Sequence, residues 1–129
     1  MAKRKMILDL DTGVDDALAI AYALADPEVD LIGIVSSYGN KLLDVCAENS
    51  LKLLELLGHT DIPVFKGLPH SSTSDHFDVM QVSKDIHGDN GIGDVELPAP
   101  QRAVEAESGV DFYIDAAHKY GKDLIIIPT

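Results

Sequence analysis

Short apolar runs that alternate with amphipathic helical patterns constrain the fold of this chain more than any other feature. Nearly continuous apolar runs are typical of buried parallel strands, because helices cover both faces of such sheets. Apolar residues at i, i+3 and i+4 spacing predict helices between them. The expected strands span residues 6–10, 29–36, 62–65 and 124–127, and the expected helices span residues 17–26, 43–57 and 109–120. This alternation predicts an α/β fold with a Rossmann-like open parallel sheet and helices on both faces.

The stretch from residue 66 to residue 107 shows neither periodicity. It contains three prolines and a serine-rich run at residues 71–74. Loops of this length in compact domains are usually functional or mobile. We therefore expect one α/β domain over residues 1–129, in which residues 66–107 form a long, mobile loop.

The composition narrows the possible partners. Ten basic and 22 acidic residues give a net charge of −12. A surface this acidic repels nucleic acid and anionic membranes, which leaves a small molecule as the expected ligand. Cys46 is the single cysteine, so no internal disulfide can form, and no apolar run approaches membrane-spanning length. These features favour a cytoplasmic protein.

Acidic residues follow the first expected strand. Asp9, Asp11, Asp15 and Asp16 place four carboxylates within eight residues. The helix dipole favours acids at a helix start by ~0.3–1 kcal/mol, which accounts for the last two but not for the pair at the strand end. Open parallel sheets bind ligands at the carboxyl ends of their strands. Because Ca²⁺ and Mg²⁺ prefer oxygen ligands, the cluster predicts a metal site at this edge.

Four segments together resemble the inosine-uridine-type nucleoside hydrolases. The pattern Asp-x-Asp-Thr-Gly-x-Asp-Asp follows the first strand, with Thr12 where proline is more usual in that family. The other three segments are Gly-Ile-Val-Ser-Ser-Tyr-Gly-Asn at residues 33–40, Ile-His-Gly-Asp-Asn-Gly-Ile-Gly at residues 86–93, and Ile-Ile-Ile-Pro-Thr at residues 125–129. The resemblance implies hydrolysis of the N-glycosidic bond of ribonucleosides to ribose and free base, with Ca²⁺ as the cofactor.

The resemblance also implies a metal-binding set. Asp11 and Asp16 would ligate Ca²⁺, and the backbone carbonyl of Thr129 would be a further ligand. The cation would lower the pKa of a bound water, and Asp11 would be the general base that activates this water. Asp9 would hold the other carboxylates in position without binding the cation itself.

The substrate would be held by neighbouring residues. Asp15 and Asn40 would hold the ribose hydroxyls, and His87 would line the base pocket. A lone loop histidine is more often a solvated surface residue, and this alternative stays open for His87. Neither the preferred base nor the general acid can be assigned from these segments.

The family continues beyond the strand that matches residues 125–129. Its Gly-Pro-Leu-Thr-Asn continuation and a late His-Asp pair have no counterpart in these 129 residues. The domain therefore resembles a truncated N-terminal portion. We expect this chain alone to bind metal weakly and to hydrolyse nucleosides little or not at all. Its last strand should expose apolar surface, through which it would form a homo-oligomer or another association.

Two other functions remain open. A haloacid-dehalogenase-type phosphatase also begins with a strand that ends in Asp-x-Asp, where the first acid is a nucleophile and Mg²⁺ is required. That motif has no need for the Asp15–Asp16 pair and expects threonine or valine at Gly13. A non-catalytic metal- or ribose-binding module would gain stability from Ca²⁺ without turnover.

Overall fold

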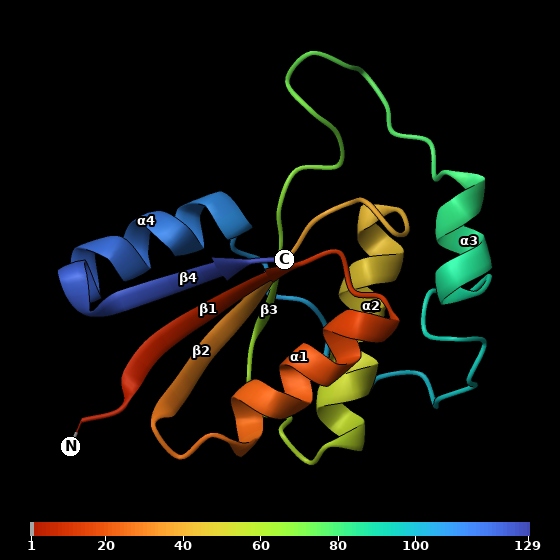
Figure 1. The fold of residues 1–129 in the computed structure, drawn as a ribbon. Helices are drawn as coiled ribbons and strands as arrows, with labels where there is room; N and C mark the ends of the chain where they lie inside the picture. The colour runs from red at the N-terminus through yellow and green to blue at the C-terminus, as the bar shows by residue number, and fades with distance from the viewer. Residues whose placement is uncertain (1) are drawn as a thin grey trace.

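The computed structural model describes residues 2–129 and contains a four-stranded, wholly parallel sheet (Figure 1). The strand order is β3-β2-β1-β4, so β2 and β3 lie on one side of β1 and β4 lies on the other. The strands are β1 (Arg4–Leu10), β2 (Val29–Ser36), β3 (Val64–Lys66) and β4 (Leu124–Pro128). The helices are α1 (Val14–Ala25), α2 (Leu43–Leu56), α3 (Gln81–His87) and α4 (Gly109–Tyr120), and the 3₁₀ turn η1 (Gly121–Asp123) precedes β4. The predicted fold class is confirmed.

Helices cover the two faces of the sheet separately (Figure 1). Successive side chains of a strand point to opposite faces. Leu8 of β1 accordingly packs in the core shared with α1 and α2, whereas Ile7 packs in a second core beneath α4. In this second core the rings of Phe65 and Phe112 stack with centroids 3.8 Å apart. The strand ends that carry the polar residues converge near the C-terminus.

The helix predicted over residues 109–120 is α4, and local interactions define both of its ends. Ser108 caps its start, because the Ser108 hydroxyl accepts the backbone N–H of Asp111 at 3.1 Å. Gly121 follows the last residue of the helix with a positive φ of 53°, a conformation that glycine adopts at little cost. The strand predicted over residues 29–36 has the predicted bounds.

One expectation about the helices was wrong. The segment predicted as one long loop at residues 66–107 contains α3, whose seven residues are too few to show a helical period in the sequence. In α1 the helical spacing of Leu18 with Ala21 suggests burial, yet Leu18 is 72% exposed, whereas Ile20 and Ala23 are buried.

One edge strand of the sheet is β3, and the other is β4. Ile126 and Ile127 are 45% and 37% exposed there, which agrees with the expected apolar surface on the last strand. Association through this edge stays a prediction. Among residues 2–129, no helix is long and apolar enough to cross a membrane.

Candidate active site at the carboxyl edge of the sheet

The turn between β1 and α1 holds Asp11 in one orientation. Its Oδ2 accepts the backbone N–H of Asn40 at 2.8 Å, and the Asn40 amide donates to the Asp11 carbonyl at 3.1 Å. A Cβ on Gly39 would lie 2.2 Å from Asp11 Oδ2, so only glycine permits this approach. Buried Thr12 fixes the same turn to α2 through a 2.6 Å hydrogen bond with Ser50.

Asp16 is the buried acid of the cluster, with 1% of its surface exposed. Its Oδ1 accepts the Thr129 hydroxyl at 2.8 Å, and the Gly13 N–H approaches Oδ2 at 3.4 Å. Burial raises the pKa of Asp16, and the charges of Asp15 and Asp11 raise it further, while the Thr129 hydrogen bond opposes them. The fold therefore holds a carboxylate where ionisation is unfavourable without a nearby cation.

The donor chemistry of this site fits a hard cation. Asp11 and Asp16 offer carboxylate oxygens, and Thr129 offers its carbonyl and hydroxyl from the end of β4. Oxygen-only sets are the ligands that Ca²⁺ prefers. Within residues 2–129, no group of three Asp, Glu, His or Cys side chains could hold a metal ion by itself.

His87 lies at the start of α1 even though it follows Gly13 by more than seventy positions. Its side chain is buried, and Nδ1 accepts the backbone N–H of Val14 at 3.0 Å. A nitrogen that accepts carries no proton, so Nε2 carries the ring proton in the neutral form. Nδ1 also lies 4.0 Å from a carboxylate oxygen of Asp15, whose side chain is 72% exposed. His87 is thus buried beside the start of α1 and is not a solvated surface residue.

Gly13 separates His87 from Asn40. A Cβ at this position would lie 2.5 Å from His87 Nδ1 and 2.7 Å from Asn40 Nδ2. Its φ of −118° is open to any residue, so the requirement for glycine here is purely steric. The two side chains could not flank the turn so closely around a larger residue.

Asp9 faces the opposite side of the sheet from α1. The Tyr113 hydroxyl of α4 donates a short hydrogen bond to Asp9 Oδ2. The Asp9 carbonyl accepts the backbone N–H of Thr129 at 3.0 Å. Sequence reasoning missed Tyr113, although its helical spacing with Ala116 and Tyr120 places a polar group on the buried face of α4.

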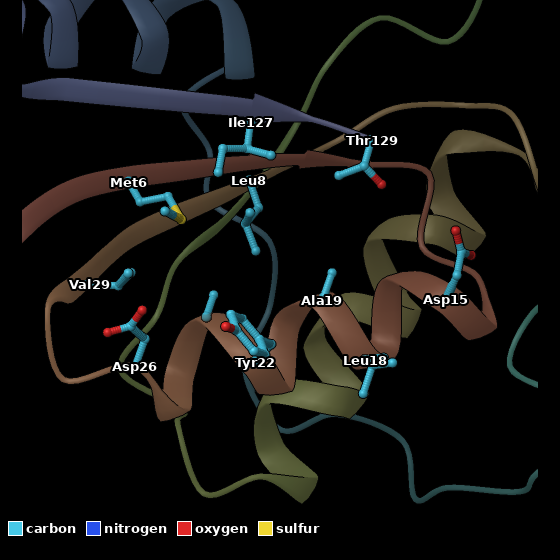
Figure 2. A pocket seen from close by; sticks show the side chains of 11 residues that line it. Met6, Leu8, Asp15, Leu18, Ala19, Tyr22, Asp26, Val29, Ile127 and Thr129 are labelled. Carbon is cyan, nitrogen blue, oxygen red and sulfur yellow. The ribbon is translucent and has the colours of Figure 1, made fainter.

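A cavity of about 450 Å³ opens beside this site (Figure 2). Asp15 and Thr129 lie toward one end and Asp26 toward the other, and the wall between them is mostly apolar. The apolar wall comes from α1, β1 and β4 and includes Leu8, Leu18, Tyr22 and Ile127. The cavity therefore reaches the candidate site only at one end.

Comparison with known proteins identifies relatives along the whole chain. A model of the inosine-uridine preferring nucleoside hydrolases matches residues 6–129. A solved structure of a purine-preferring ribonucleoside hydrolase from Gardnerella vaginalis is 58% identical, with a TM-score of 0.95 over 97% of this chain and 40% of that one. A probable uridine nucleosidase of Arabidopsis thaliana is 37% identical over 115 residues, which cover 89% of this chain and 35% of that protein.

A further relative is shorter. An uncharacterized protein of Corynebacterium ammoniagenes is 50% identical over 95 residues, which are 74% of this chain and 99% of that protein. Against the hydrolase structure and the nucleosidase, by contrast, the chain spans a little over a third of the relative's length.

Proposed function

Because the chain belongs to the inosine-uridine preferring nucleoside hydrolase family, we propose that it carries the metal- and ribose-binding side of a site that hydrolyses ribonucleosides. The reaction breaks the N-glycosidic bond with one water and yields ribose and a free base. The observation that supports it most is the convergence of Asp11, Asp16, Asn40 and Thr129 at one edge of the sheet.

The metal would be Ca²⁺, held by Asp11, Asp16 and the Thr129 carbonyl. Bound there, it would supply the positive charge that lowers the pKa of a water. Asp11 acts as the general base that takes the proton of the attacking water. Its Oδ2 is fixed by the Asn40 N–H, so its other oxygen is left to receive that proton. Asp9 supports the group from the opposite face.

Asp15 and Asn40 hold the ribose hydroxyls. The exposed carboxylate of Asp15 is free to accept two hydroxyl hydrogen bonds, as a ribose diol requires. His87 stands beside Asp15 with its Nε2–H free to donate to the sugar or the base. The water oxygen attacks the anomeric carbon as the C–N bond breaks, and the departing base takes up one proton.

A purine nucleoside is the favoured substrate. The relative with 58% identity is named for purine preference, whereas the relative with 37% identity is named for uridine. The higher identity supports inosine over uridine.

The phosphatase alternative is disfavoured by Asp9. In that reaction the first acid of the motif must attack phosphorus, yet Asp9 Oδ2 accepts the Tyr113 hydroxyl on the face that α4 covers. A hydrogen-bonded, partly buried carboxylate is a poor nucleophile. A non-catalytic binding module remains the second candidate, supported by the same convergence of oxygen ligands.

Binding is tested on residues 1–129 by calorimetric titration with Ca²⁺, followed by ribose. We expect Asp11→Asn to abolish Ca²⁺ binding and Asp15→Asn to abolish only the Ca²⁺-dependent binding of ribose. Glu96→Gln removes one exposed charge away from the site and should change neither. Absence of Ca²⁺ binding by the unmodified chain would overturn the proposal.

Hydrolysis is tested on the product of the complete reading frame, by release of reducing sugar from inosine and uridine. We expect Ca²⁺-dependent release that is faster for inosine and lost in Asp11→Asn. Binding without release would favour the non-catalytic module. Release of phosphate from a phosphomonoester in Mg²⁺, without nucleoside hydrolysis, would favour the phosphatase.

A further inference from the structure

The hydrogen bond between Tyr113 and Asp9 joins α4 to the candidate site across 104 positions of sequence. Within residues 2–129, Tyr113 is the one hydrogen-bond partner of the Asp9 side chain. Asp9 lies in β1 between Val35 of β2 and Pro128 of β4. The Tyr113 hydroxyl therefore holds the carboxylate of a residue whose main chain pairs with both neighbouring strands.

Tyr113 is suited to act as a permanent donor. Its ring packs in the core beneath α4 with Ile7, Val35 and Phe65. Burial raises the pKa of the Tyr113 phenol well above its usual range, and the hydrogen bond and charge of Asp9 raise it further. The phenol thus keeps its proton at neutral pH and donates it in the hydrogen bond to the Asp9 carboxylate.

Asp9 is linked to the proposed metal ligands through its main chain. Its carbonyl accepts the Thr129 N–H at 3.0 Å, and the Thr129 hydroxyl donates to Asp16 at 2.8 Å. Three hydrogen bonds, joined through the covalent bonds of Asp9 and Thr129, therefore connect Tyr113 with Asp16. Asp11, two residues after Asp9, lies at the same end of β1.

We propose that Tyr113 is a positioning residue of the metal site, which holds the Asp9 carboxylate on the α4 face and thereby fixes Thr129 and Asp16 on the other side. This inference rests on the proposed function. Without the phenol hydroxyl, the Asp9 carboxylate loses its hydrogen-bond donor and its fixed orientation. Thr129 and Asp16 are then held less firmly, because they are linked to Asp9 by hydrogen bonds. Removal of such outer partners commonly weakens metal affinity by about 10–100-fold.

The test compares Tyr113→Phe with Tyr120→Phe. Tyr120 belongs to the same helix and the same core, but its hydroxyl has no hydrogen-bond partner among residues 2–129. Calorimetric Ca²⁺ titration should show a roughly tenfold higher Kd in Tyr113→Phe, toward the low end of the usual range. Tyr120→Phe should stay within about twofold of the unmodified chain.

A second background separates positioning from packing. Asp9→Asn removes the charge that needs the phenol, so adding Tyr113→Phe to it should raise the Kd by less than about twofold. If Tyr113 acted only through its ring packing, Tyr113→Phe would leave the Kd unchanged in both backgrounds, because phenylalanine keeps the ring. Circular dichroism of each variant verifies that it is folded.

The outcomes distinguish this inference from the proposed function. Absence of Ca²⁺ binding in the unmodified chain overturns both. Ca²⁺ binding that Tyr113→Phe leaves unchanged or makes tighter overturns the positioning role and leaves the proposed function standing. An equal loss in both backgrounds overturns the role as well, because Asp9 would then play no part.

Discussion

Asp16→Asn should stabilise the metal-free chain and at the same time abolish its response to Ca²⁺. The substitution keeps the shape of the side chain and the oxygen that accepts the Thr129 hydroxyl at 2.8 Å. It removes the negative charge of a residue that is only 1% exposed and that lies close to Asp11 and Asp15. The two opposite effects follow from one buried charge.

The magnitude follows from the contacts of the carboxylate. The effective penalty for burying one ion is several kcal/mol. One good charged hydrogen bond, from Thr129, returns about 1.5–3 kcal/mol, and the 3.4 Å approach of the Gly13 N–H adds little. We therefore expect a gain of about 1–2 kcal/mol at pH 7, or roughly 4–8 °C in Tm for a domain of this size.

In excess Ca²⁺ the unmodified chain should become more stable than Asp16→Asn. At 100 times Kd, a ligand that binds only the native state adds about 2.7 kcal/mol to the stability of the unmodified chain. Asp16→Asn should gain nothing, since it lacks one of the two carboxylate ligands. Thermal unfolding in EDTA and then in excess Ca²⁺ measures both effects, with Glu96→Gln as the control for loss of one exposed charge. A variant that is no more stable than the unmodified chain in EDTA, or that still responds to Ca²⁺, would refute this reasoning.

Three other predictions concern single side chains. Gly39→Ala should weaken Ca²⁺ binding at least tenfold in calorimetry, because the added Cβ would lie 2.2 Å from Asp11 Oδ2 and would displace that carboxylate; unchanged affinity would contradict the site geometry. Burial raises the pKa of Cys46 to about 12, so a colorimetric disulfide reagent should leave this thiol unmodified at pH 8 until denaturant is added, and rapid native labelling would contradict its burial. The hydrogen bond that His76 Nδ1 donates to Asp75 raises the pKa of His76, so protonation of His76 stabilises the native state slightly at low pH, and this gain is lost as the pH rises through the native pKa. Nuclear magnetic resonance titration should show a lower His76 pKa in Asp75→Asn, and an equal value in both proteins would exclude this pairing.

The fold was predictable because its signals are local and repeated. Leu31, Ile32, Ile34 and Val35 form a nearly continuous apolar run within residues 29–36, so β2 is visible in the sequence. The Ser108 cap and Gly121 mark the two ends of α4 in the same way. Each signal depends on backbone hydrogen bonding or burial within a few residues, and such effects can be inferred without tertiary contacts.

The contacts of the site were less predictable for the same reason. The Tyr113–Asp9 hydrogen bond spans 104 positions, and the His87–Val14 hydrogen bond spans 73. No local pattern reports which face of α4 meets β1, or that the short helix α3 comes to lie against the start of α1. Leu18 shows the converse error, since its helical spacing suggests burial although the sheet leaves that face of α1 open.

The four acids of the cluster have different structural environments, which their sequence alone does not show. Three of its four carboxylates are each held by a donor from a different part of the chain: Asp9 by Tyr113, Asp11 by the Asn40 backbone and Asp16 by Thr129. Only Asp15 projects into solvent, with 72% of its side chain exposed. Like charges packed this densely repel one another, and separate donors let the fold offset that repulsion one acid at a time. Since Asp11 and Asp16 lie at the proposed metal position and Asp15 is exposed to solvent, we propose that metal binding and sugar binding depend on different members of one eight-residue motif.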